Sequence, residues 1–231
     1  MLKEIIDKYY LDREKDKDKN KGQRHFYISQ AGKCSRAVFF RFKNVPEKEL
    51  EPNILRLFDH GDHMHQLIMG ALTSTRDIHV VASEVKIPPQ ELVSGRADAI
   101  ISDGKDLYVL DIKTMNSMIF KSLEKPKEEN VQQIQLYLYY FKIPKGILLY
   151  VNKDNLELKE FIFDYNKTEA ESLVKGLGFL KKQIDLDIVP ARLADYPDNW
   201  QCRYCQYKEI CGRGDQQEMN WQNLKNKLRL V

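Results

Sequence analysis

The chain has 231 residues, of which 42% are hydrophobic and 31% charged, with a formal net charge of +3. Such a chain is long enough for one sizeable core, and its mildly basic charge permits a nucleic-acid partner without requiring one. No run of 18 apolar residues and no Gly-x-x-x-x-Gly-Lys-[Ser/Thr] loop occurs, which argues against a membrane-spanning helix and an ATP-driven motor. The first 24 residues lack the apolar segment of a secretory signal, so we expect an intracellular, cytoplasmic protein with no membrane partner.

The first third of the chain predicts helices. A short N-terminal helix precedes a charged stretch, Asp12 to Arg24, which we expect to be a solvated linker. Residues 29–42 predict a loop and then a helix, and residues 53–72 predict a long helix. Apolar side chains recur along the long helix at helical spacing and predict one buried stripe: Ile54, Leu57, Phe58, Met64, Leu67, Ile68 and Leu72.

The middle of the chain predicts strands. Residues 79–88 predict a strand that contains Glu84, and residues 93–101 and 106–114 predict a β-hairpin around the turn Ser102–Asp106. Further elements are expected as a helix at 128–141, hairpin strands at 146–152 and 156–164, an amphipathic helix from Lys167 to Asp187, and a last helix within 212–231. Strands flanked by helices predict an α/β fold with a mixed central sheet covered on both faces.

Two aspartates and a lysine lie in the first hairpin, where a core strand is expected. Strand alternation puts Asp111 and Lys113 on one face and Ile112 on the other, and hairpin pairing brings Asp98 beside Asp111. Two adjacent carboxylates repel each other unless a cation lies between them, and oxygen ligands suit Mg²⁺ or Mn²⁺. The residues alone leave open a plainer interpretation, an edge hairpin with a cross-strand salt bridge.

The four cysteines form a second candidate site. Cys34 stands alone near the start, whereas Cys202, Cys205 and Cys211 follow a C-x₂-C-x₅-C spacing. Four thiolates are able to close a zinc site or an iron–sulfur cluster, and the spacing alone does not distinguish them. Either site would clip the N-terminal region to the C-terminal tail and stabilise the fold by closing a long loop. Four ordinary free cysteines are the remaining alternative.

In their order along the chain, these features resemble the PD-(D/E)xK nuclease superfamily and, within it, the RecB-like exonucleases. The resemblance covers residues 28–212 and is carried by four stretches, GDHMH (61–65), GRADAI (95–100), LDIKT (110–114) and QIQLY (133–137). One early cysteine followed by a late triplet is similar to the iron–sulfur branch of that family, which includes AddB-type nucleases and the CRISPR-associated Cas-four exonucleases. The compact chain looks most like the Cas-four group.

The resemblance implies a restriction-endonuclease-like core and a metal-dependent DNA exonuclease that acts on single strands or ends. It implies a Mg²⁺ or Mn²⁺ site formed by His65, Asp98, Asp111 and the main-chain carbonyl of Ile112. It implies the catalytic set Asp98, Asp111, Lys113, Gln133 and Tyr137, although Gln135 and Tyr139 also satisfy the Q-x-x-x-Y pattern. It also implies a [4Fe–4S] cluster held by Cys34, Cys202, Cys205 and Cys211.

The same resemblance suggests how the chain is organised and what it serves. We expect an N-terminal helix and linker over residues 1–27, a nuclease domain over 28–212 and a tail over 213–231. The expected role lies in CRISPR spacer acquisition, with adaptation integrase proteins as partners, or in DNA recombination and repair. Two alternatives belong to other classes: a DNA-binding, partner-dependent subunit with little activity alone, and a zinc-stapled RNA-binding protein.

Overall fold

The computed structural model describes residues 1–15, 23–88, 90 and 92–229. These residues form two compact units. The first, which we call the sheet unit, comprises residues 27–32 and 53–174. The second, which we call the cysteine unit, combines both ends of the chain, from segments 1–26, 33–52 and 175–231. None of the helices within the described ranges is long and apolar enough to cross a membrane.

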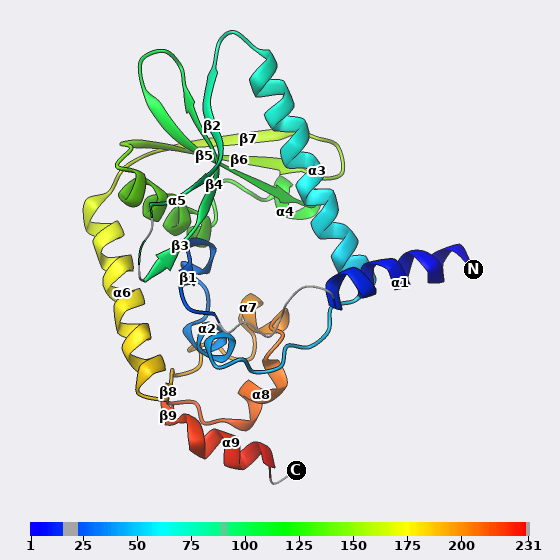
Figure 1. Ribbon diagram of the computed structural model, residues 1–231, viewed down its shortest axis with the longest axis vertical. Coiled ribbons are helices and arrows are strands. Elements are labelled where there is room, and N and C mark those ends of the chain that lie inside the picture. The colour runs from blue at the N-terminus through cyan, green and yellow to red at the C-terminus, as the bar shows by residue number, and fades with distance from the viewer. Residues whose placement is uncertain (16–22, 89, 91, 230–231) are drawn as a thin grey trace. The chain divides into compact units, whose positions relative to one another are not determined.

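The sheet unit is built on one five-stranded mixed sheet in the order β2-β4-β5-β6-β7 (Figure 1). Neighbouring strands are antiparallel except β5 and β6, which are parallel. The strands are β2 His79–Lys86, β4 Arg96–Ser102, β5 Leu107–Met115, β6 Lys145–Asn152 and β7 Leu158–Asp164. The predicted mixed sheet and both predicted hairpins are therefore confirmed.

Helix α5, Glu128–Phe141, joins the parallel strands β5 and β6 and packs against the sheet. It approaches β6 closely at Gly146, where a Cβ atom would lie 2.7 Å from the Ile134 side chain. Shorter elements complete this part of the chain: β1 Phe26–Tyr27, the 3₁₀ turn η1 Ile28–Gln30, β3 Val93–Ser94 and α4 Ser117–Lys121. The close approach at Gly146 fixes which residues of α5 reach the strands.

Helix α3, Pro52–Ser74, has the predicted length, but its predicted buried stripe is partly wrong. Ile68 is buried against β4, β5 and β6, whereas Leu57, Phe58 and Leu67 are 46%, 55% and 51% exposed. At about 100° per residue, the seven predicted side chains span roughly half of the helix circumference. The sheet covers a narrower arc, formed by Ile68 with Met69 and Leu72.

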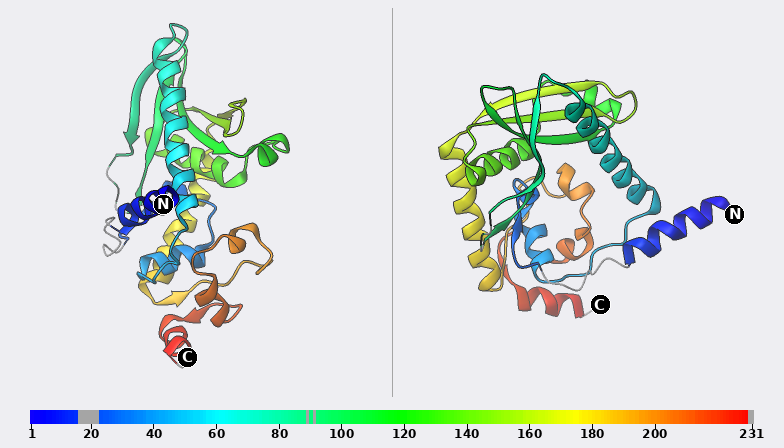
Figure 2. Two further views of the ribbon diagram at one scale, coloured as in Figure 1. Left: turned by 90° about the vertical axis from the view of Figure 1, so that its right-hand side faces the viewer. Right: turned by 45° about the horizontal axis from the view of Figure 1, so that its top comes forward.

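The cysteine unit is mainly helical and joins segments that are far apart in the sequence. In Figures 1 and 2, α2 lies beside the C-terminal helices in every view. Its elements are α1 Leu2–Lys15, α2 Ser35–Phe42, the C-terminal end of α6 Lys167–Asp185, β8 Ile188–Val189, α7 Trp200–Arg203, α8 Lys208–Arg213, β9 Met219–Asn220 and α9 Trp221–Arg229. The predicted helices at both ends of the chain are confirmed.

An aromatic core holds these segments together. Phe39 of α2 packs edge-on against Trp221 with ring centroids 5.8 Å apart, and Phe40 lies 5.6 Å from Tyr207. Both phenylalanines are fully buried. The predicted linker begins too early, because α1 continues through Lys15, and its residues 16–22 lie outside the described part of the chain.

Candidate active site

The candidate site lies where β4 and β5 stop pairing with each other. The antiparallel register runs as far as Ala99 opposite Leu110, so one further step would put Asp98 opposite Asp111. Instead, the Asp98 carboxylate takes the place of a ladder partner, because its Oδ2 accepts a hydrogen bond from the Ile112 amide at 2.6 Å. This local replacement explains why a carboxylate is tolerated here: it satisfies a backbone donor that the ladder leaves open.

The glycine of the GRADAI stretch has a steric role beside Asp98. A Cβ atom at Gly95 would lie 2.8 Å from the side chain of Ile28, which is fully buried. The motif glycine therefore permits the buried Ile28 to pack directly on the chain as it enters β4. Packing at this point helps to set where Asp98 stands.

Asp111, Lys113 and Gln133 form a closed polar triangle. The Lys113 Nζ lies 2.7 Å from Asp111 Oδ2 and donates to Gln133 Oε1 at 2.9 Å. The Gln133 Nε2 in turn donates to Asp111 Oδ1 at 3.3 Å. Asp111 is 3% exposed, and its Oδ2 contacts the ammonium group as an ion pair without a hydrogen bond of good geometry. Each oxygen of this buried carboxylate thus faces a donor group within the triangle.

Helix α3 contributes His65 to the same place. Gly61, one turn earlier, faces Thr114 of β5, and the His65 Nδ1 lies 3.4 Å from Asp98 Oδ1. His63 and His60 are not part of the triangle: His63 is exposed and contacts Gln66, and His60 lies near Asp154. Of the three histidines on α3, the structure therefore brings His65 to the aspartates.

Burial and neighbouring charges shift the pKa values of Asp111 and His65. Burial raises the pKa of Asp111; the Lys113 ammonium acts in the opposite direction, and the Asp98 carboxylate reinforces the rise. The Asp98 carboxylate raises the pKa of His65, although partial burial opposes this change. Each carboxylate thus has a cationic or potentially cationic neighbour, and the site attracts positive charge.

The two Q-x-x-x-Y pairs on α5, Gln133 with Tyr137 and Gln135 with Tyr139, differ in their hydrogen-bond partners and not in the burial of their glutamines. Gln133 and Gln135 are both buried, but Gln135 donates to the carbonyl of Asp164 at 2.9 Å and accepts from the amide of Asn166 at 2.8 Å. Tyr137 donates to the Arg96 carbonyl at 2.6 Å, and burial raises its pKa, so its hydroxyl stays protonated. Gln133 and Tyr137 therefore face the strands that carry the aspartates.

The side chains around Asp111 are donors of the kind that a divalent cation prefers. Among the residues that the structure describes, no group of three or more His, Cys, Asp or Glu side chains is arranged to hold a metal ion. The chemistry of the site nevertheless fits one, because Asp98 and Asp111 offer carboxylate oxygens and His65 offers an imidazole nitrogen in the same place. The residues present therefore fit a Mg²⁺ or Mn²⁺ ion in chemical type.

All four cysteines lie in the cysteine unit and are free thiols. Cys34 forms the N-cap of α2, Cys202 and Cys211 lie in α7 and α8, and Cys205 lies between those helices. Burial raises the pKa values of Cys34, Cys202 and Cys205, and each of them is affected electrostatically by Cys211. The fold thus brings Cys34 into one neighbourhood with three cysteines that lie about 170 residues later, although in the described residues these thiols do not form a group arranged to hold a metal ion.

The sequence profile of the PD-(D/E)XK nuclease superfamily matches residues 48–212. This range contains every element of the sheet, the triangle around Asp111, and three of the four cysteines. The chain belongs to the PD-(D/E)XK nuclease superfamily. The matched range begins after Cys34, so the early cysteine lies outside the matched part of this nuclease domain.

Individual relatives of this PD-(D/E)XK chain agree with the assignment. The chain is 34% identical over 120 residues to the CRISPR-associated exonuclease Cas4 of Saccharolobus solfataricus, an alignment that spans 52% of each chain. The crystal structure of SSO0001 has a TM-score of 0.55 at 23% identity and covers 91% of this chain and 96% of its own. A phage-related exonuclease from Haemophilus somnus 129PT has a TM-score of 0.55 at 11% identity, covering 72% and 96%. The two structures share the fold.

Two arginines of this PD-(D/E)XK protein have structural roles that the sequence patterns did not predict. Arg96 accepts the Tyr137 hydroxyl through its carbonyl and pairs with Glu84 through its side chain, so Glu84 points to Arg96 rather than to the aspartates. Arg36 is fully buried beside Cys211, with its Nη1 3.9 Å from the sulfur. Their partners lie far away in the sequence or on another strand, and no spacing pattern signals such contacts.

Proposed function

We propose that this protein is a Mg²⁺- or Mn²⁺-dependent deoxyribonuclease that hydrolyses phosphodiester bonds as an exonuclease. The observation that carries the proposal is the juxtaposition of two carboxylates, the buried Asp111 paired with Lys113 and Asp98 close to His65. The Asp98 carboxylate raises the pKa of the buried Asp111, and a divalent cation held by both carboxylates would offset their repulsion. Membership of a nuclease superfamily supports the same conclusion.

The proposed metal ligands are His65, Asp98, Asp111 and the main-chain carbonyl of Ile112. When bound, the divalent ion supplies a water of lowered pKa and neutralises charge on the scissile phosphate. The chain's own residues set the geometry. Lys113, held by Gln133 and Asp111, presents its ammonium group where negative charge develops, and Tyr137 ties α5 to the start of β4.

For the substrate, we propose single-stranded DNA or DNA ends, with CRISPR adaptation integrase proteins as partners. The support is the relative named as a CRISPR-associated exonuclease, of which the chain spans about half the length. A role in recombination or repair uses the same chemistry. A partner-dependent DNA-binding subunit with little activity of its own is the second candidate, favoured by the ion pair in which Lys113 occupies one side of the Asp111 carboxylate.

The experiment is cleavage of end-labelled single-stranded and duplex DNA with Mg²⁺, with Mn²⁺ and with EDTA. We expect metal-dependent loss of nucleotides from an end, and Asp111→Ala to reduce the rate by roughly 10³-fold while DNA binding is retained. Asp77→Ala, an exposed aspartate outside the site, is the control. Normal cleavage by Asp111→Ala would refute the assignment, and DNA binding without cleavage by the wild type would favour the partner-dependent subunit.

We further propose that Cys34, Cys202, Cys205 and Cys211 hold a [4Fe–4S] cluster that joins the two ends of the chain. Their shared neighbourhood in one unit supports this ligand set. Anaerobically purified protein should be brown and contain iron and acid-labile sulfide in equal amounts. Colourless protein that carries zinc would replace the cluster with a zinc site.

A further inference from the structure

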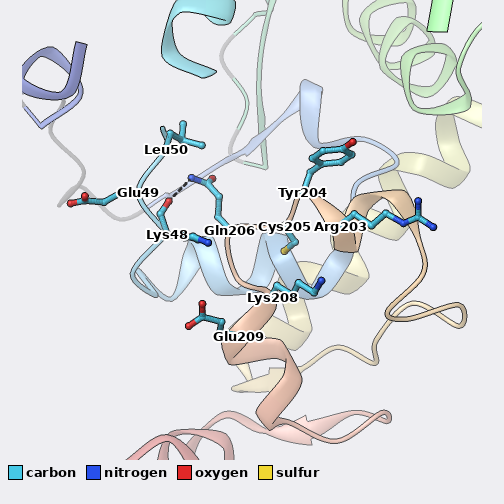
Figure 3. A pocket seen from close by; sticks show the side chains of 9 residues that line it. All are labelled: Lys48, Glu49, Leu50, Arg203, Tyr204, Cys205, Gln206, Lys208 and Glu209. Carbon is cyan, nitrogen blue, oxygen red and sulfur yellow. Dashed lines mark hydrogen bonds between the residues drawn. The ribbon is translucent and has the colours of Figure 1, made fainter. Parts of the chain in front are cut away.

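A pocket of about 330 Å³ opens in the cysteine unit. Its volume lies in the range of small-ligand sites. The pocket is drawn in Figure 3, and its lining residues are Lys48, Glu49, Leu50, Arg203, Tyr204, Cys205, Gln206, Lys208 and Glu209. All nine belong to two segments, 48–50 and 203–209, so the pocket lies between the stretch before α3 and the cysteine loop.

The two segments are fixed to each other by hydrogen bonds in both directions. The Lys48 amide donates to the Gln206 carbonyl at 3.3 Å, and the Gln206 Nε2 donates back to the Lys48 carbonyl at 3.1 Å. Nearby, the Tyr207 hydroxyl donates to Glu47 at 2.6 Å. The pocket therefore has preformed walls, which lowers the ordering cost of binding a ligand.

Tyr204 is the most unusual lining residue. It lies between Cys202 and Cys205, yet its side chain is 83% exposed, whereas Tyr207 three residues later is 5% exposed. A ring exposed at the wall of a pocket is available to stack on a ligand that enters it. Figure 3 shows the ring projecting from the cysteine loop at the edge of the pocket.

Charge is distributed unevenly around this ring. In Figure 3, Arg203 lies near Tyr204, Lys208 lies below them next to Glu209, and Glu49 lies on the opposite side of the view. Arg203, Lys208 and Lys48 are exposed, and none of the salt bridges within the described ranges involves them. The side that carries the exposed ring is thus also cationic.

We infer that this pocket binds a nucleotide of a single-stranded nucleic acid, with a base stacked on Tyr204 and the adjoining phosphates on Arg203 and Lys208. A fixed aromatic ring flanked by cations is the combination that single-strand binding uses, because every base offers a face for stacking. The two carboxylates restrict where phosphates lie and so orient the strand. The pocket shares no residue with the proposed metal ligands, and binding there does not require cleavage.

The test measures binding of a fluorescently labelled oligothymidylate to the full chain in EDTA, where metal-dependent cleavage is absent. Tyr204→Ala should weaken binding about 5- to 100-fold, and Tyr204→Phe, which retains the ring, should bind as the wild type does. Tyr204→Leu should fail like the alanine variant. Tyr9→Ala removes another exposed tyrosine (59% exposed), which lies in α1 outside the pocket, and should leave the affinity unchanged.

Salt dependence and opposite-sign variants test the binding of the phosphates. Arg203→Ala should lower the slope of log K against log salt by about 0.7 for each phosphate that the protein no longer neutralises. Glu209→Gln removes a negative charge and should strengthen binding. Oligoribonucleotides of the same length in a parallel titration show whether the strand is DNA or RNA.

The inference is overturned if Tyr204→Ala, with the visible absorbance of wild-type protein, binds the oligonucleotide as tightly as wild type. The pocket would then serve another ligand, such as a protein partner. It is also overturned if Tyr204→Phe loses as much affinity as Tyr204→Ala, because stacking would not be involved. The proposed function stands or falls separately, on metal-dependent cleavage by the wild-type chain.

Discussion

In the sheet unit, Asp98, Asp111, Lys113, Gln133 and Tyr137 come from 40 consecutive residues, and only His65 is added from an earlier helix. In the cysteine unit, Cys34 and Arg36 meet residues that lie more than 150 positions later. The first arrangement needs one hairpin and one helix to be in register. The second requires both ends of the chain to be folded and held together.

The two regions also treat buried charge differently. The Asp111 carboxylate is held by side chains, the Lys113 ammonium group at 2.7 Å and the Gln133 amide at 3.3 Å. The guanidinium of Arg36 is held by carbonyl oxygens: it donates to Pro190 at 2.6 Å, Asp215 at 2.9 Å and Gln217 at 3.0 Å. The buried carboxylate thus depends on side chains, whereas the buried guanidinium depends on the main chain of three residues.

Replacing Arg36 should have the largest effect on stability. The variant tests whether the cysteine unit unfolds separately from the sheet unit. Arg36→Met retains much of the volume but leaves three carbonyl groups without donors, so we expect a loss of about 3 kcal/mol in unfolding free energy. Both tryptophans, Trp200 and Trp221, lie in the cysteine unit, so their fluorescence in urea reports on this unit.

Circular dichroism in the same titration reports on both units. If the units unfold separately, the tryptophan transition of Arg36→Met shifts to lower urea while a second transition stays in place. A single transition that shifts as a whole would contradict this expectation, because the two units would then unfold as one cooperative structure. Arg41→Met is the matched control: its side chain is 50% exposed and pairs with Glu47, so its loss should cost less than about 1 kcal/mol.

An intermediate effect is expected in the sheet unit from Tyr137→Phe. This change removes the hydrogen bond to the Arg96 carbonyl and should cost about 1 kcal/mol, because the ring still fills its place. The loss should appear in circular dichroism and leave a separate tryptophan transition unchanged. Tyr139→Phe, on the half-exposed side of the same helix, should cost much less. Equal losses would show that the Arg96 contact is not what holds α5 to β4.

The same contrast explains what could be predicted from the sequence. Strand alternation and a five-residue turn were sufficient to place Asp98, Asp111 and Lys113 together, because these are local relations. The choice between Gln133 and Gln135 needed their hydrogen-bond partners in the folded chain, since both side chains are buried. The exposure of Leu57 and Leu67 depends on how wide an arc of α3 the sheet covers. The contacts of Arg36 could not be predicted because its partners are main-chain carbonyl groups, which every residue possesses.

The smallest effect is expected in the turn between β4 and β5, where the contacts join residues two or three positions apart. Asp103 accepts from the amides of Lys105 and Asp106, and these hydrogen bonds lower its pKa from 3.8 to about 2. Because the pKa is lower in the folded state, the carboxylate stabilises the turn above about pH 4, and this contribution disappears as the pH falls from 3.8 towards 2.

Asp103→Asn lacks that titration, so its melting temperature should lie about 1–2 °C below wild type at about pH 7, and the gap should close near pH 2. Thermal scans by circular dichroism at both pH values check this. A gap in melting temperature that persists at the lower pH would mean that the Asp103 side chain acts through its shape alone. The charge of Asp103 would then not stabilise the turn, although the carboxylate contacts two backbone amides.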